Sequence, residues 1–109
     1  MATANKTVIE VGASASGVQG GVNQAKNDMV ILRASGTWDS TVLSFNVWTG
    51  VGQPQSPTDS GFISEYTFNA NEQVSYLIGT YNYWTITASG GGASSDIEFT
   101  CQSVQDCNR

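Results

Sequence analysis

Hydrophobic and polar residues alternate along the segment Thr41–Thr49, TVLSFNVWT. Leu43, Phe45 and Val47 share one side of an extended chain, because successive side chains of a strand point to opposite faces. The other side carries polar residues and Trp48. The pattern predicts a strand with one buried face, and it leaves open why a tryptophan points away from that face.

Similar short runs, rich in β-branched and aromatic residues, recur between clusters of Gly, Ser, Asn and Asp. No long helical period separates them. We therefore expect an all-β fold, a single antiparallel β-sandwich or jelly roll of about seven to eight strands. The expected strands are Lys6–Val11, Met29–Ala34, Thr41–Thr49, Phe62–Phe68, Gln73–Gly79, Tyr83–Ala88 and Asp96–Ser103.

Three connecting segments differ in character. Residues 13–26 contain glycines at positions 17, 20 and 21, which favour a flexible loop over a single helical turn. Residues 50–61 contain both prolines and form the best candidate for an exposed functional loop. Residues 90–95, GGGASS, are expected to be flexible and offer little side-chain chemistry to a ligand.

The alternation also predicts which side chains fill the core. Burying each aliphatic or Phe side chain contributes about 1.5–3 kcal/mol, which can offset the ordering entropy of one small domain. The expected core residues are Ile9 or its neighbours, together with Ile31, Leu43, Phe45, Val47, Phe62, Tyr66, Phe68, Val74, Tyr76, Ile78, Trp84, Ile86, Ile97 and Phe99.

The chain has 109 residues, of which 39% are hydrophobic and 12% are charged. This length suits one domain, so residues 1–109 are expected to form a single β-sandwich. Short polar arms, residues 1–5 and 104–109, are expected at its ends, where they could order on a neighbouring molecule.

The net charge of −5 argues against two classes of partner. Lys6, Lys26, Arg33 and Arg109 are scattered along the chain, whereas binding to a phosphate backbone needs clustered cations. Neither nucleic acid nor an anionic membrane is expected to bind. No apolar run approaches the roughly 20 residues that cross a bilayer, and the N-terminus lacks the apolar core of a signal peptide. Synthesis in the cytoplasm is therefore expected.

Candidate catalytic groups are few. The chain has no histidine, which removes the commonest general base and metal ligand. Asp96 and Glu98 could form a carboxylate pair, although a solvated strand face explains them better. Asn69, Asn71 and Glu72 could offer oxygens to calcium, but a plain turn accounts for them. We expect no catalytic, metal or cofactor site, and a protein that is not an enzyme.

Cys101 and Cys107 are the two cysteines. Their spacing allows a small C-terminal disulfide and matches no zinc-binding pattern. Cytoplasmic synthesis favours two reduced thiols, one half-buried on a strand and one in the tail.

Four aromatic residues fall opposite the expected core or in turns: Trp38, Trp48, Tyr81 and Tyr83. They could stack on sugar rings, contact another protein, or cap the end of the sandwich with each indole N–H satisfied locally. We interpret them as candidate partner-contact residues, and the other two roles stay open.

The order of features resembles a known family. A short strand, KTVIEV, is followed by a small-residue loop, then by RASGTWDSTVLSFNVWTG, a polar Pro/Gly loop, and the closing half SYLIGTYNYWTITASGGGASSDIEFTCQSV. This resembles the small all-β virion proteins of tailed bacteriophages, most of all the capsid cement, or head-decoration, proteins.

The resemblance implies a structural protein on the capsid surface of a virion. Such proteins bind the major capsid protein, commonly as homodimers or homotrimers, and staple neighbouring capsomers together. The alternative is a carbohydrate- or receptor-binding module of a phage tail or fibre.

Overall fold

The computed structural model describes residues 6–25, 29–78 and 82–104. Over these residues the chain forms strands and connecting turns without a helix, so the all-β expectation is confirmed. The strands are β1 (Lys6–Val11), β2 (Gly17–Gln24), β3 (Met29–Thr37), β4 (Val42–Trp48), β5 (Phe62–Phe68), β6 (Glu72–Leu77), β7 (Tyr83–Ser89) and β8 (Asp96–Val104).

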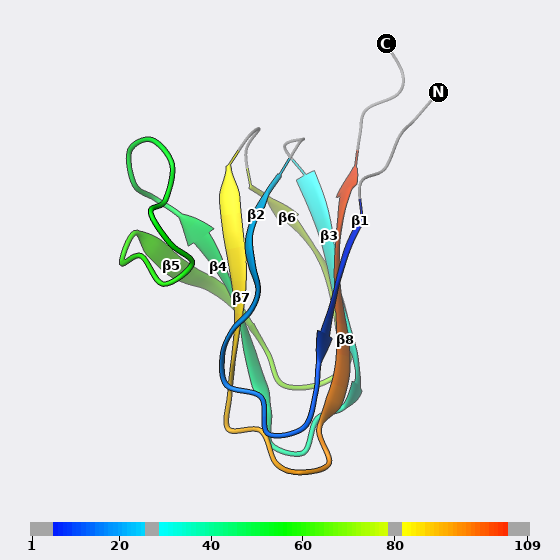
Figure 1. Ribbon diagram of the computed structural model, residues 1–109. Coiled ribbons are helices and arrows are strands. Elements are labelled where there is room, and N and C mark those ends of the chain that lie inside the picture. The colour runs from blue at the N-terminus through cyan, green and yellow to red at the C-terminus, as the bar shows by residue number, and fades with distance from the viewer. Residues whose placement is uncertain (1–5, 26–28, 79–81, 105–109) are drawn as a thin grey trace.

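The eight strands form two antiparallel sheets of four, in the orders β1-β8-β3-β6 and β2-β7-β4-β5. Consecutive strands alternate between the sheets except at the β4–β5 hairpin. This is the jelly-roll arrangement of the β-sandwich. Figure 1 shows the two sheets face to face. The β4–β5 connection, in green, lies on the side of its own sheet that faces away from the β1-β8-β3-β6 sheet.

The inner faces of both sheets share one core. Phe45 packs against Trp84 with ring centroids 5.5 Å apart, Trp84 against Phe99 at 6.0 Å, and Phe99 against Phe68 at 5.8 Å. All four side chains are buried. Aromatic pairs at such separations add to the free energy gained from area burial alone. The aromatic core was therefore anticipated by the alternation in these strands.

Two expected core residues lie elsewhere. Ile31 is on the outer face of β3, because Val30 and Leu32 are the fully buried positions of that strand. The apolar run Met29–Leu32 has four residues and no internal alternation, so its phase cannot be read from the sequence. Phe62 is half-buried and packs on Trp48 outside the main core.

The glycine-rich segment expected to be a loop is strand β2. Its pairing with β7 shifts register between Gln19 and Asn23. Gly20 adopts φ 80° in this irregularity, and an added Cβ would lie 2.8 Å from Ile9 Cδ1. Glycine here permits a bulge and a close approach to β1 without ending the strand.

The connection over residues 90–95 is hydrogen-bonded to the turn between β3 and β4, which contains Asp39. Gly92 N–H donates to the Asp39 carbonyl oxygen at 3.0 Å, and Ser94 N–H donates to Asp39 Oδ2 at 2.8 Å. Ser14 N–H in turn donates to the Gly92 carbonyl oxygen at 2.8 Å. These bonds tie three connections together at one end of the sandwich.

Candidate functional site

Three exposed apolar side chains lie side by side on the outer face of the β1-β8-β3-β6 sheet, which we call the open face. Met29 is directly opposite Leu77 on β6 and Val104 on β8. Their exposed fractions are 36% for Met29, 69% for Leu77 and 40% for Val104. Directly opposed residues have Cβ atoms about 4.5–5.5 Å apart, so the three form one continuous apolar cluster.

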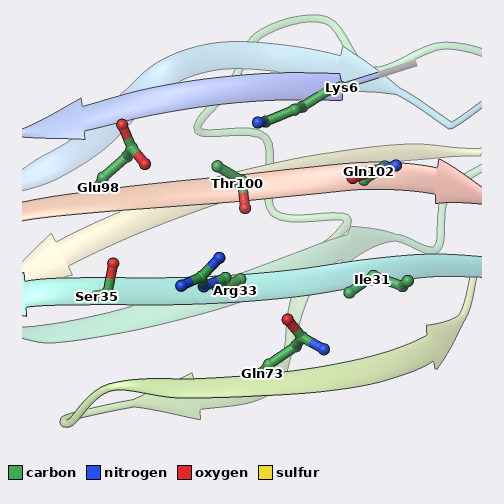
Figure 2. Close-up of a pocket in the computed structure, with 8 residues that line it drawn as sticks. All are labelled: Lys6, Ile31, Arg33, Ser35, Gln73, Glu98, Thr100 and Gln102. Carbon is green, nitrogen blue, oxygen red and sulfur yellow. The ribbon is translucent and has the colours of Figure 1, made fainter. Parts of the chain in front are cut away.

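Next to this cluster, the open face holds a polar pocket of about 120 Å³. Figure 2 shows its side chains rising from all four strands of the sheet. Charged groups, amides and hydroxyls dominate the lining, which consists of Lys6, Ile31, Arg33, Ser35, Gln73, Glu98, Thr100 and Gln102.

The pocket contains both of the Lys and Arg residues that the structure describes, Lys6 and Arg33. The strand register explains the convergence: Lys6 is opposite Gln102, and Arg33 is opposite Thr100 two residues earlier on β8. Neither cation forms an ion pair with a described residue. The pocket can therefore offer both positive charges to a carboxylate or another polar group of a partner.

In the sequence these two cations are 27 positions apart, so they were expected to be scattered. Arg33 shares its strand phase with Ile31, so placing Ile31 in the core also hid Arg33 from the outer face. Assigning Val30 and Leu32 to the core instead would have placed Arg33 on the face to which Lys6 also belongs.

The outer face of the β2-β7-β4-β5 sheet is arranged differently. Loop residues 57–59 and the strand residues Asn46, Thr85 and Thr87 line one cavity, so the loop at 50–61 packs on this sheet. We call the sheet surface together with this loop the covered face.

Trp48 belongs to the covered face and is only 9% exposed. Its indole Nε1–H donates to the Gly52 carbonyl oxygen at 2.9 Å, and its ring lies 5.1 Å from that of Phe62. Gly50 and Gly61 contact the ring so closely that an added Cβ would lie 2.3 Å and 2.4 Å from it. The expectation of an outward phase was correct, but the ring is covered by its own loop and its N–H is bonded within the chain.

Trp38 is also bonded locally. Its Nε1–H donates to Asn71 Oδ1 at 2.8 Å, and the same oxygen accepts the Gly36 backbone N–H at 3.0 Å. The indole is half-buried and packs against the core. Tyr83 is half-buried at the start of β7, and Tyr81 lies outside the described residues. The structure therefore does not bring the three described candidates, Trp38, Trp48 and Tyr83, onto one exposed surface.

Two tyrosine–glutamate hydrogen bonds join the sheets where β5 and β6 form their edges. Tyr76 donates to Glu65 Oε1 at 2.6 Å, and Tyr66 donates to Glu72. Burial, followed by the bond to Glu65, raises the pKa of Tyr76 to about 12. The bond to Glu72 is the largest cause of the raised pKa of Tyr66.

The other candidate groups have structural surroundings. Asp96 and Glu98 are exposed on β8, as a solvated strand face would have them. Residues 6–25, 29–78 and 82–104 contain no group of three or more His, Cys, Asp or Glu side chains that could hold a metal ion. Cys101 is a buried free thiol whose pKa is raised to about 12 by burial, and Cys107 lies outside the described residues.

Comparisons with known proteins add no relative: no protein-family model matches the chain, and no curated protein sequence matches it. In the described part of the chain, no helix has the length and apolar character needed to cross a membrane.

Proposed function

We propose that the protein is a structural component of a bacteriophage virion that binds the outer surface of the capsid and stabilises contacts between subunits of the major capsid protein. It acts as a non-enzymatic cement protein. The open face is its docking surface.

The apolar cluster of Met29, Leu77 and Val104 is the observation that favours the open face as the docking surface. Exposed apolar residues scattered singly are normal, whereas a continuous cluster bordered by polar groups is typical of a protein–protein contact. Covering it would remove apolar area from water at roughly 25 cal/mol per Å². The neighbouring Lys6 and Arg33, free of ion pairs with described residues, can add charged hydrogen bonds that orient the partner.

The capsid as partner follows from the resemblance to head-decoration proteins. A capsid repeats one surface many times, so a modest contact at each site becomes strong when several linked copies bind together. Self-association into a dimer or trimer is part of the proposal, because a symmetric oligomer presents matched faces to a symmetric lattice.

Sedimentation with phage heads tests the docking surface. Heads assembled without this protein would be mixed with the wild-type chain, with Leu77→Asp, or with Val51→Asp, and then pelleted. Val51 is fully exposed on the loop of the covered face, so it is a matched hydrophobic-to-acid control. We expect the wild type and Val51→Asp to pellet with heads, and Leu77→Asp to bind at least about tenfold more weakly.

Bound wild-type protein should also raise the temperature at which heads rupture, and light scattering should give the mass of a dimer or trimer. Failure of the wild type to bind heads would overturn the capsid assignment. Equal binding by the Leu77 and Val51 variants would overturn the assignment of the face.

A further inference from the structure

The covered face contains a cavity of about 280 Å³ between the loop at 50–61 and the β2-β7-β4-β5 sheet. Asn46 of β4 and Thr85 and Thr87 of β7 line it from the sheet. Thr58 and Asp59 line it from the loop, and Phe62 from the start of β5. This is more than twice the volume of the pocket on the open face.

The sheet side of the cavity is a buried polar network. Asn46 is 8% exposed and Thr85 is 1% exposed. Asn46 Nδ2 donates to Thr85 Oγ1 at 3.2 Å and to Thr87 Oγ1 at 3.3 Å. Its Oδ1 accepts no hydrogen bond from a residue that the structure describes. The Asn46 side-chain oxygen lines this cavity as an amide acceptor, so a ligand hydroxyl entering the cavity can donate a hydrogen bond to it.

The loop side is held in place by its own hydrogen bonds. Asp59 Oδ1 accepts the Gly61 N–H at 3.1 Å, and Asp59 Oδ2 accepts the Gln55 N–H at 3.2 Å. Each carboxylate oxygen has a second lone pair for a further donor. The Phe62 ring, supported by Trp48, adds an apolar surface beside these acceptors. The site is therefore formed before any ligand arrives, which lowers the entropic cost of binding.

From this chemistry we propose that the cavity binds one neutral sugar residue. Its lining combines an amide, threonine hydroxyls, a carboxylate and an aromatic ring, and it includes no cation. Sugar hydroxyls can donate to Asp59 and Asn46 while the C–H face of the ring packs on Phe62. The carboxylate repels anionic ligands, and the volume, below the range of drug-sized sites, suits a single ring.

Nuclear magnetic resonance titration of the full chain tests this site. The probes are the methyl glycosides of glucose, galactose, mannose and N-acetylglucosamine, each up to about 100 mM, with methyl glucuronide as the anionic comparison. We expect saturable shifts for at least one neutral probe at the Asn46 side-chain amide and the Thr85 and Thr87 backbone amides. Methyl glucuronide should bind at least about tenfold more weakly than that probe.

Thr58→Val removes one hydroxyl from the exposed loop side, so its effect can be measured without disturbing the core. It should weaken binding about fivefold, the usual consequence of losing one hydrogen bond. Thr67→Val, an exposed threonine of β5 that does not line the cavity, should bind like the wild type.

Three results would overturn the proposal: no saturable shift with any neutral probe, shifts confined to other surfaces, or equal affinity in Thr58→Val and the wild type. Equal affinity for methyl glucuronide would overturn its restriction to neutral sugars. Each result is independent of whether the chain pellets with phage heads.

Discussion

The two outer faces of this jelly roll are made from similar strands but expose different surfaces. On the open face, Met29, Leu77 and Val104 remain in contact with solvent. On the covered face, the larger apolar side chain Trp48 is buried by its own loop. The difference shows that an apolar residue on an outward phase has two possible fates: cover from within the chain, or cover by another molecule.

The contrast also separates two kinds of chemistry. The open face combines an exposed apolar cluster with the cations Lys6 and Arg33, so it suits a broad protein surface. The covered face has a hollow of larger volume, with Asp59 and no cation in its lining, so it suits a small neutral ligand. One sandwich can therefore present two independent binding surfaces.

The largest effect should come from removing the buried indole. Trp48→Ala is expected to lower the free energy of unfolding by about 3–5 kcal/mol, because it leaves a cavity under the loop and an unpaired Gly52 carbonyl. Leu77→Ala on the open face should change it by less than about 0.5 kcal/mol. Urea denaturation measures both, and equal losses would contradict the distinction between the faces.

A smaller effect is expected from crowding the same indole. Gly61→Ala places a Cβ about 2.4 Å from the Trp48 ring, so the loop must shift, at a cost of about 1–3 kcal/mol. Gly12→Ala is the matched control, because an added Cβ there meets nothing within 4 Å. Thermal unfolding of both variants measures the difference in stability. An unfolding temperature of Gly61→Ala equal to that of the wild type would show that the loop does not pack tightly on the Trp48 ring.

The smallest effect concerns the side where β5 and β6 join the sheets. Tyr76→Phe should lower stability by about 0.5–1.5 kcal/mol at neutral pH, since the bond to Glu65 is lost. The raised pKa means that the folded state retains the phenol proton more tightly than the unfolded state. The stabilisation that the protonated Tyr76 side chain gives the folded state is present below pH 10 and is lost as the pH rises from 10 towards about 12.

Denaturation measured across that pH range should show a shallower loss of stability in Tyr76→Phe than in the wild type. An identical pH dependence of the two proteins would exclude a contribution from this tyrosine. The Tyr76–Glu65 hydrogen bond between the sheet edges would then contribute little to the stability of the sandwich.

Alternation predicted the strands well where apolar and polar residues take turns. Strands β1 and β5 begin and end at the expected residues, and Phe45, Trp84 and Phe99 are buried as expected. It failed where the pattern has no period. The glycine-rich β2 has too few apolar side chains to produce an alternating pattern. The apolar run around Ile31 does not show which of its residues point into the core.

The alternation of apolar and polar residues predicted less about the candidate sites than about the strands. The outward phase of Trp48 was read correctly, yet nothing local shows that Gly50 and Gly61 fold onto its ring. Lys6 and Arg33 are far apart along the chain and line one pocket only because β8 pairs with both β1 and β3.

The sequence by itself thus determined the all-β class, most strands and the aromatic core, because side-chain alternation and turn residues act over a few neighbouring positions. Only the tertiary structure decided which outward residues stay exposed. That choice depends on strand register and on where the loop at 50–61 packs, and both are set by contacts between residues distant in the chain.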